Sequence, residues 1–234
     1  MDGTIKVWDA GTLELKSEKT NAHRGEVKSL AFSPDGTKIV SGGACGDETI
    51  KVWDTDSLTL KSEKANAHSN TISFVAFSPD GKTIVSGSWD KMLKVWDSAT
   101  LELKSEKKNA HDGWVRSVDF DKDGGKIVSG GRDGTLKVWE LRDQPVGERD
   151  FVASKDDQTA IDQAYNEGCT PVSINGVAVS SWEEFDAKLE EIEGEITIKV
   201  WDSGTLELKA TKENAHSDWV TSVAFNPVDG KTIV

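Results

Sequence analysis

The stretch Thr49-Ile50-Lys51-Val52-Trp53-Asp54 decides the fold, because near copies of it occur five times along the chain. Each copy ends in Trp-Asp, or once in Trp-Glu, and the tryptophans are Trp8, Trp53, Trp96, Trp139 and Trp201. Successive tryptophans are 45, 43, 43 and 62 residues apart. A fixed period of this size indicates an array of structural repeats. The last interval is about 19 residues too long, so the array is interrupted there.

A second motif, Asn-Ala-His, recurs beside the first and ends at His23, His68, His111 and His216. Between the two motifs, apolar and polar residues alternate over 27–32 and 38–41, and a Pro-Asp-Gly turn at 34–36 separates these segments. Alternation of this kind is typical of short antiparallel strands. Each repeat thus predicts four strands, the last of them an exposed edge strand such as 58–64. A sheet this small buries its faces only by packing on neighbours arranged around an axis.

The composition limits the classes of partner and compartment. The 234-residue chain has 28 basic and 41 acidic residues, which give a net charge of −13. Nucleic acid or an anionic membrane would repel such a chain, so we expect neither as a partner. No apolar run approaches the roughly 18 residues of a membrane-spanning helix, and residues 1–4 do not begin a secretory signal. Two cysteines, Cys45 and Cys169, cannot build a disulfide framework, so we expect a cytoplasmic protein.

These motifs resemble those of the WD40 repeat family. Asn-Ala-His corresponds to the family's Gly-His, the Ser-Pro-Asp-Gly turn matches, and repeats end in Trp-Asp or Trp-Glu. The resemblance covers residues 1–140 and 195–234 and implies an all-β, WD40-type β-propeller of four to five blades. The last blade would be split between the termini, with residues 1–19 completing the blade that ends the chain. The alternative interpretation is a fragment of a longer array.

In that family a His, a Ser or Thr, a Trp and an Asp form a buried chain of hydrogen bonds in each blade. The resemblance implies three such chains: His23, Ser41, Asp47 and Trp53; His68, Ser86, Asp90 and Trp96; and His111, Ser129, Asp133 and Trp139. In the split blade, His216 and Trp8 would meet across the seam without a serine, so we expect this blade to be the weakest. Hydrolases also use Ser, His and Asp together, but recurrence in every repeat favours a structural role. We therefore expect no enzyme activity, no metal and no cofactor.

Residues 141–194 break the repeat pattern. They predict a hairpin around Asn175-Gly176, and over 180–192 they predict a helix that begins after two serines. The apolar face of this helix would be Trp182, Phe185, Leu189 and Ile192.

The order of these elements resembles the C-terminal half of a PDZ domain, so that 141–194 would be a PDZ-like insert. Val146 and Gly147 would then lie in a peptide groove, at the loop that binds a terminal carboxylate, although Glu148 departs from the pattern of that loop. A degenerate fourth blade that carries a helix is the alternative. In both interpretations we expect residues 195–202 to serve also as the third strand of a blade.

The repeats differ mainly around their turns, at positions that in WD40 proteins face one rim of the ring, called the top, and commonly contact partners. We expect these residues to bind protein: Glu26, Lys28, Thr71, Ser73, Trp89, Trp114, Arg116, Arg132, Trp219 and Thr221. Tryptophan and arginine are the side chains most enriched at binding hot spots. The arginines favour an acidic or phosphorylated segment as the ligand.

The sequence therefore predicts a non-enzymatic scaffold for protein–protein interaction, a monomer that binds a peptide or protein segment on the top rim. One alternative is a fragment or non-functional product of a recently duplicated repeat array. Another is PDZ-type binding of a C-terminal peptide through the insert.

Overall fold

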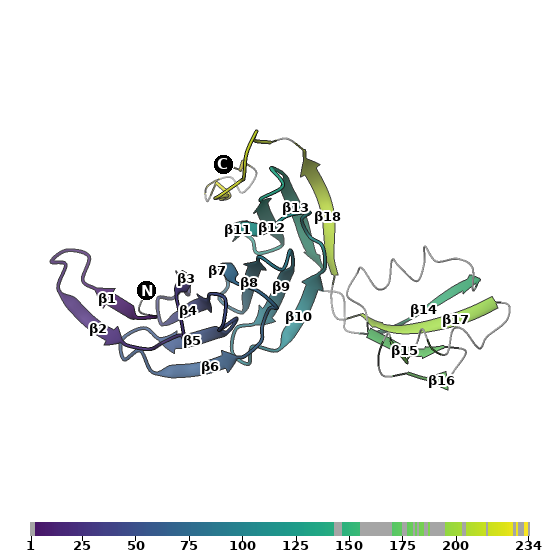
Figure 1. Ribbon diagram of the computed structural model, residues 1–234, viewed down its shortest axis with the longest axis horizontal. Helices are drawn as coiled ribbons and strands as arrows, with labels where there is room; N and C mark the ends of the chain where they lie inside the picture. The colour runs from purple at the N-terminus through teal and green to yellow at the C-terminus, as the bar shows by residue number, and fades with distance from the viewer. Residues whose placement is uncertain are drawn as a thin grey trace.

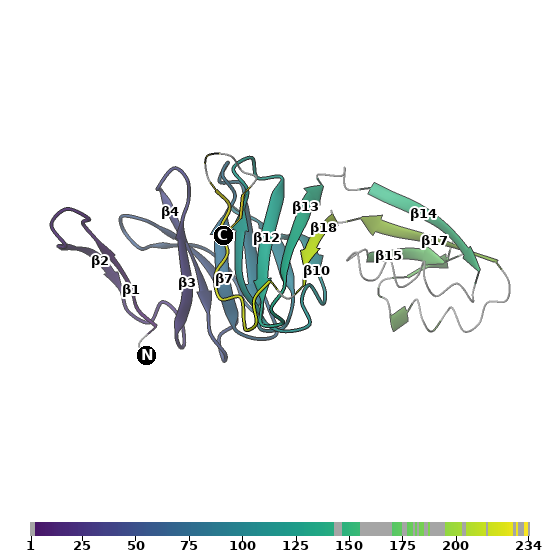
Figure 2. The same cartoon turned by 90° about the horizontal axis from the view of Figure 1, so that it is seen from above.

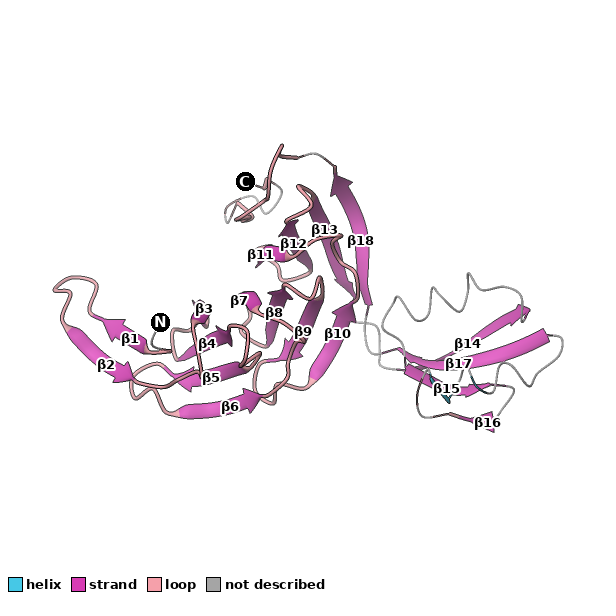
Figure 3. Cartoon of the chain, viewed as in Figure 1, coloured by secondary structure: helices cyan, strands magenta, loops and turns pink. Residues whose placement is uncertain are grey.

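A computed structural model gives the fold, in which almost all regular structure is β-strand (Figure 3). The structure describes residues 3–142, 147–154, 170–174, 177–179, 181, 183–184, 187, 195–202, 205–213, 215–226, 228 and 232–233. Within these ranges helix is limited to Glu183, Glu184 and Ala187. None of the described helical residues belongs to a segment long and apolar enough to span a membrane.

Three four-stranded antiparallel sheets, here called the first, second and third blades, follow one another along an arc (Figure 1). The first blade is β3 (Val27–Phe32), β4 (Lys38–Gly43), β5 (Ile50–Asp54) and β6 (Leu60–Lys64). The second is β7 (Ile72–Phe77), β8 (Thr83–Ser88), β9 (Leu93–Asp97) and β10 (Leu103–Lys107). The third is β11 (Val115–Phe120), β12 (Lys126–Gly131), β13 (Leu136–Arg142) and β18 (Thr205–Lys212). In each blade the first strand lies on the inner side of the arc and the fourth on the outer side.

The apolar core lies between blades, because strands of neighbouring sheets face each other. Val40 of β4 packs against Ile72 and Val75 of β7 in one buried cluster. The approach is closest at a glycine of each second strand: a methyl group added at Gly42 would lie 2.7 Å from Ile72 Cγ2, well inside van der Waals contact. Gly87 faces Val115 in the same way. The glycine of the Ser-Gly pair that recurs in these second strands therefore sets the spacing between blades.

The predicted closure of the ring between the termini is wrong. β1 (Ile5–Trp8) and β2 (Leu15–Lys19) form a two-stranded sheet at one end of the arc (Figures 1 and 2), while the C-terminal segment lies at the other end (Figure 1). Trp8 is 51% exposed, and His216 is exposed as well, so the two do not meet. Packing between blades fixes the curvature, and three blades turn through only part of a circle.

A further four-stranded sheet interrupts the third blade between β13 and β18. It consists of β14 (Gly147–Ser154), β15 (Thr170–Ile174), β16 (Val177–Ala178) and β17 (Glu195–Asp202), in the spatial order β14-β17-β15-β16. The predicted hairpin is present, since Ile174 pairs with Val177 across the Asn-Gly loop. The sheet's order differs from the consecutive order of a blade, so it is not a degenerate blade.

The expectation that 195–202 also forms the third strand of a blade is wrong. β17 pairs with β14 and β15, while β13 occupies the third position of the blade and pairs with β12 and β18. Both copies of the motif have the same strand pattern, but β13 follows β12 after a short turn. Closing the short loop loses less chain entropy than closing the long one, which favours β13.

Candidate functional site

Five side chains from neighbouring blades meet at one rim of the arc. They form what we call the Trp–Arg cluster: Trp89, Trp114, Arg116, Arg132 and Trp219. Trp89 follows β8, Trp114 and Arg116 lie at the start of β11, and Arg132 follows β12. All five belong to the top-rim set expected from the sequence.

The cluster is layered, with the guanidinium groups over ring faces. The Trp89 and Trp114 rings stack with centroids 4.1 Å apart and planes 6° from parallel. Arg116 Cζ lies 5.1 Å from the Trp114 centroid and 4.7 Å from that of Trp219. Arg132 Cζ lies 4.4 Å and 4.5 Å from the same two centroids. Cation–π attraction at these distances holds both arginines without consuming their N–H donors.

Backbone hydrogen bonds between loops fix the positions of these side chains. The Trp89 amide donates to the Thr71 carbonyl at 3.0 Å, and the Arg132 amide donates to the Trp114 carbonyl at 2.8 Å. The Val220 amide donates to the Gly131 carbonyl at 3.1 Å, which brings Trp219 beside Arg132. These backbone hydrogen bonds hold the loops of the cluster in place without a bound ligand.

Two polar atoms of the cluster have no hydrogen-bond partner among the described residues, although both are buried: Trp89 Nε1 and Arg116 Nε. Leaving a buried donor unpaired costs about 1–3 kcal/mol. Neither arginine pairs with a described carboxylate, in a chain with 41 acidic residues. Arg132 and Trp219 remain exposed, so the cluster offers donors to a ligand from solvent.

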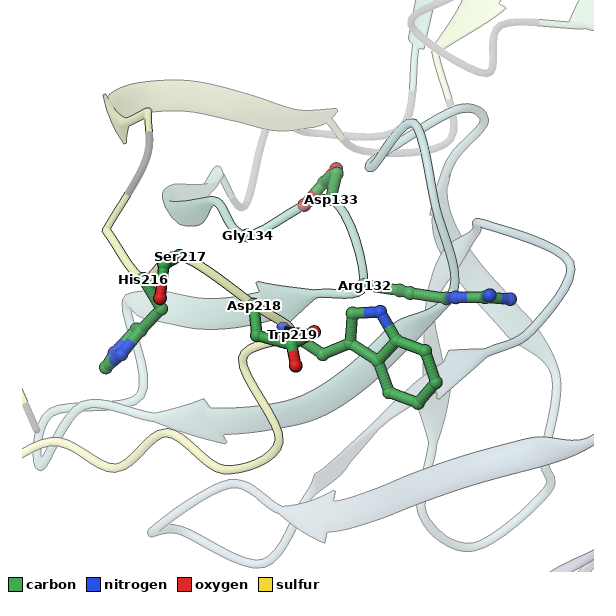
Figure 4. A pocket seen from close by; sticks show the side chains of 7 residues that line it. All are labelled: Arg132, Asp133, Gly134, His216, Ser217, Asp218 and Trp219. Atoms are coloured by element: carbon green, nitrogen blue, oxygen red, sulfur yellow. Dashed lines mark hydrogen bonds between the residues drawn. The ribbon is translucent and has the colours of Figure 1, made fainter.

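An open pocket of 560 Å³ adjoins the cluster and shares Arg132 and Trp219 with it (Figure 4). Its remaining lining residues are Asp133, Gly134, His216, Ser217 and Asp218. In Figure 4 the Arg132 and Trp219 side chains lie together, and the His216 ring points away from them. The pocket extends the surface beyond the five side chains, along the loop that leads to Trp219.

The remaining residues expected on the top rim make other contacts. Glu26 and Lys28 form an ion pair on the first blade. Thr71 is 1% exposed. The Ser73 hydroxyl lies within hydrogen-bond distance of the Gly87 and Val115 carbonyls and can donate to either, which is a structural role between blades. Thr221 is exposed and lies two residues after Trp219.

The hydrogen-bonded chains implied by the family resemblance are present in all three blades. In the second blade His68 Nδ1 lies 2.8 Å from Asp90, His68 Nε2 lies 2.7 Å from Ser86 Oγ, and Trp96 Nε1 donates to Ser86 Oγ at 2.8 Å. The serine accepts the indole N–H and donates its own proton to Nε2, so a neutral imidazole satisfies every member. The other two chains are His23, Ser41, Asp47 and Trp53, and His111, Ser129, Asp133 and Trp139.

Burial sets the protonation states in these chains. Desolvation lowers the pKa of His68 below 6.5 despite its bond to Asp90, and the pKa values of His23 and His111 are lowered for the same reason. Burial opposes ionisation of Asp133, but bonds from Thr135 and His111 outweigh it and lower its pKa to about 2. The imidazoles are therefore neutral near pH 7, and each recurring chain supports a blade.

Sequence reasoning missed one recurring contact of the motif. In the second and third blades the lysine two residues before the motif tryptophan also braces its blade: Lys94 and Lys137 donate to the carbonyls of Ala67 and Ala110 at 2.8 Å. Lys94 lies 5.6 Å from the Trp96 ring centroid. The sequence did contain a signal for this contact. The lysine is present in every copy of the motif, at a position where exposed strand residues usually vary.

The peptide groove expected at Val146 and Gly147 stays a prediction. Val146 lies outside the described residues, and Gly147 opens β14. The predicted helix is described only at Glu183, Glu184 and Ala187, where the Glu184 amide donates to the capping Ser181 hydroxyl at 3.1 Å. Among the described residues no group of three His, Cys, Asp or Glu side chains is arranged to hold a metal ion.

Comparison with protein families matches the WD domain, G-beta repeat (WD40), at residues 15–54, 60–97 and 104–140. Among solved structures, the chain is similar to Sqt1 of Chaetomium thermophilum bound to the N-terminus of the ribosomal protein L10. The identity is 25% and the TM-score 0.53, over 59% of this chain and 41% of Sqt1. It is also similar to the computationally designed Ika8 protein, at 34% identity and a TM-score of 0.50, over 59% and 40% of the two chains.

No curated protein matches the chain. The matched part is about two fifths of the length of both solved chains. No comparison supports a PDZ-like segment. The family model and the solved structures therefore agree on an all-β, propeller-like fold, with three matches to the WD40 repeat within residues 15–140.

Proposed function

We propose that this protein is a non-enzymatic interaction scaffold that binds an acidic segment of a partner protein at the Trp–Arg cluster. One observation carries the proposal: two arginines are layered among three indoles at an exposed rim, with no described carboxylate paired to either. Sqt1, which shares the fold, is solved with a peptide segment of a ribosomal protein bound, so a scaffold role suits this architecture.

The chemistry of the cluster favours carboxylate groups in the ligand. Each guanidinium keeps its edge N–H donors, and charge-assisted bonds from arginine to carboxylate are roughly twice as strong as neutral ones. The indole faces offer apolar area to side chains beside the acid. Because the protein itself carries a net charge of −13, the two arginines must attract the ligand locally, over a distance of about a Debye length (~8 Å).

Selection from a random peptide library tests this function without knowledge of the partner. The library is passed over the immobilised protein and, in parallel, over the Arg116→Gln/Arg132→Gln variant. We expect Asp and Glu beside an apolar residue to be enriched on the unmodified protein, and this enrichment to be lost on the variant. Equal enrichment on both proteins, or selection of basic peptides, would show that the cluster is not the site.

A phosphorylated segment would use the same donors. Adding a phosphoserine version of each selected peptide to the binding assay separates the two sources of negative charge. Stronger binding of the aspartate or glutamate peptide supports the proposal, and binding of the phosphorylated version alone contradicts it.

A further inference from the structure

The face of β3 that points away from the second blade is exposed at Leu30 and Phe32, unlike the same face of the other described first strands. Phe32 is 58% exposed, while its equivalents Phe77, Phe120 and Phe225 are 8%, 5% and 8% exposed. Leu30 is 48% exposed, and its equivalent Val75 is fully buried. An apolar strand face that is uncovered at one blade alone indicates that a neighbouring strand is missing there.

The missing neighbour is identified by what covers the other first strands. Val40 of β4 packs on Ile72 and Val75. In the third blade Val128 of β12 packs on Val220 and Val223. In each case the second strand of the preceding blade provides the cover. The sheet that precedes β3 holds only β1 and β2, which occupy the third and fourth positions, and β1 pairs with no other described strand.

The opposite end of the arc carries the complementary half of a blade. The Val223 amide donates to Ser117 Oγ at 3.1 Å, as the Val75 amide does to Ser29 Oγ at 3.1 Å, so 220–225 occupies a first-strand position. Phe225 bridges Ile233, as Phe77 pairs with Ile84, so residue 233 begins a second strand. Val234 stands in the sequence where Val40, Val85 and Val128 stand in the three blades.

The two halves also carry complementary parts of the hydrogen-bonded chain. The N-terminal half holds Trp8, which is 51% exposed although Trp53, Trp96 and Trp139 are 1% exposed. The C-terminal half holds the exposed His216. Figure 1 shows these halves at opposite ends of the arc, so one chain does not join them.

We propose that two copies of the chain associate so that the C-terminal half-blade of each completes the N-terminal half-blade of the other. Two equivalent junctions related by a two-fold axis would close a ring of eight blades, six complete within the chains and two shared. This inference is independent of ligand binding at the Trp–Arg cluster.

Sedimentation equilibrium of the 234-residue chain at micromolar concentration measures the association. We expect twice the mass of one chain, and we expect Leu30→Lys to return it to the monomer. Leu60→Lys is the matched control, because Leu60 is 42% exposed on the outer strand β6 and does not lie on the exposed face of β3. Both leucines are exposed in a single chain, so neither change should prevent folding. A monomer in the unmodified protein, a dimer that survives Leu30→Lys, or an open-ended series of larger species overturns the proposal.

A cross-link between copies tests the arrangement itself. Lys38 pairs with Asp54 in the first blade, and the equivalent pair across the proposed junction is Thr232 and Asp9. One chain carries Thr232→Cys and a second carries Asp9→Cys, both with the two native cysteines changed to serine. Directly opposed residues on antiparallel strands are close enough for a disulfide. We expect oxidation to link the mixture and neither chain alone. A mixture that stays unlinked excludes this junction and favours contact between two β3 faces.

Discussion

The serine at the centre of each hydrogen-bonded chain serves two partners at once. Ser86 Oγ accepts from the Trp96 indole and bonds to His68 Nε2, and all three residues are buried. The indole and the imidazole have no alternative described partner for these nitrogens. One small hydroxyl therefore keeps two large polar rings satisfied inside the blade.

Removing this hydroxyl should destabilise the protein measurably. We expect Ser86→Ala to lower the free energy of unfolding by about 1–3 kcal/mol, because it leaves buried donors and acceptors unpaired. Urea unfolding followed by tryptophan fluorescence measures the change. Ser69→Ala is the control, since Ser69 is exposed, and it should change stability by less than about 0.5 kcal/mol. Equal effects of the two changes would contradict a structural role for the chain.

The same residues predict how stability depends on pH. The pKa values of His23, His68 and His111 are lowered in the fold by burial, so the unfolded chain binds more protons just below pH 6.5. We expect the free energy of unfolding to fall as the pH drops from 7.5 to 5. A second loss follows below pH 3.8, because the pKa of Asp133 is lowered to about 2. Urea midpoints that stay constant or rise between pH 7.5 and 5 would contradict neutral imidazoles.

At the scale of the strand, contact between blades depends on the glycine in each second strand. A methyl group at Gly87 would lie 2.6 Å from Val115 Cγ1, which is shorter than carbon–carbon contacts allow. The first strand of the next blade would have to move outward.

We therefore expect Gly87→Ala to destabilise the protein by about 1–3 kcal/mol, the usual range for overpacking a core. Gly125→Ala is the matched control, because no atom lies within 4 Å of the added methyl group. Thermal unfolding of the two variants side by side provides the measurement. If Gly87→Ala is as stable as Gly125→Ala, the blades are not packed as closely as described.

The strands of the three blades could be predicted from the sequence because local pattern and tertiary position agree in every repeat. The same reasoning failed for 195–202, where a motif copy with unchanged local pattern pairs with β14 and β15 instead. The pattern of apolar and polar residues in a segment predicts that it forms a strand and which face of that strand is buried. Which of two similar strands enters the third blade depends on the length of its connection to β12. The motif itself carries no information about that length.

At the scale of the whole molecule, the top-rim side chains could be predicted from comparison of repeats, and their mutual contacts could not. The turns that carry Trp89 and Trp114 are 25 residues apart in sequence and meet only because the second and third blades are neighbours. The prediction of ring closure was wrong for a related reason. Complementary half-blades at the termini carry no information about the angle between blades, because packing at Gly42 and its equivalents sets that angle.

The central claim is that the Trp–Arg cluster binds acidic protein segments through its arginines. The most direct test is the dissociation constant of the tightest selected peptide for the unmodified protein, for Arg132→Gln and for Arg24→Gln. Arg24 is an exposed arginine that follows His23 on the first blade, outside the cluster. We predict that Arg132→Gln weakens binding about 10- to 100-fold, the equivalent of a charge-assisted hydrogen bond, while Arg24→Gln has no effect. Equal affinities for Arg132→Gln and the unmodified protein would contradict the account.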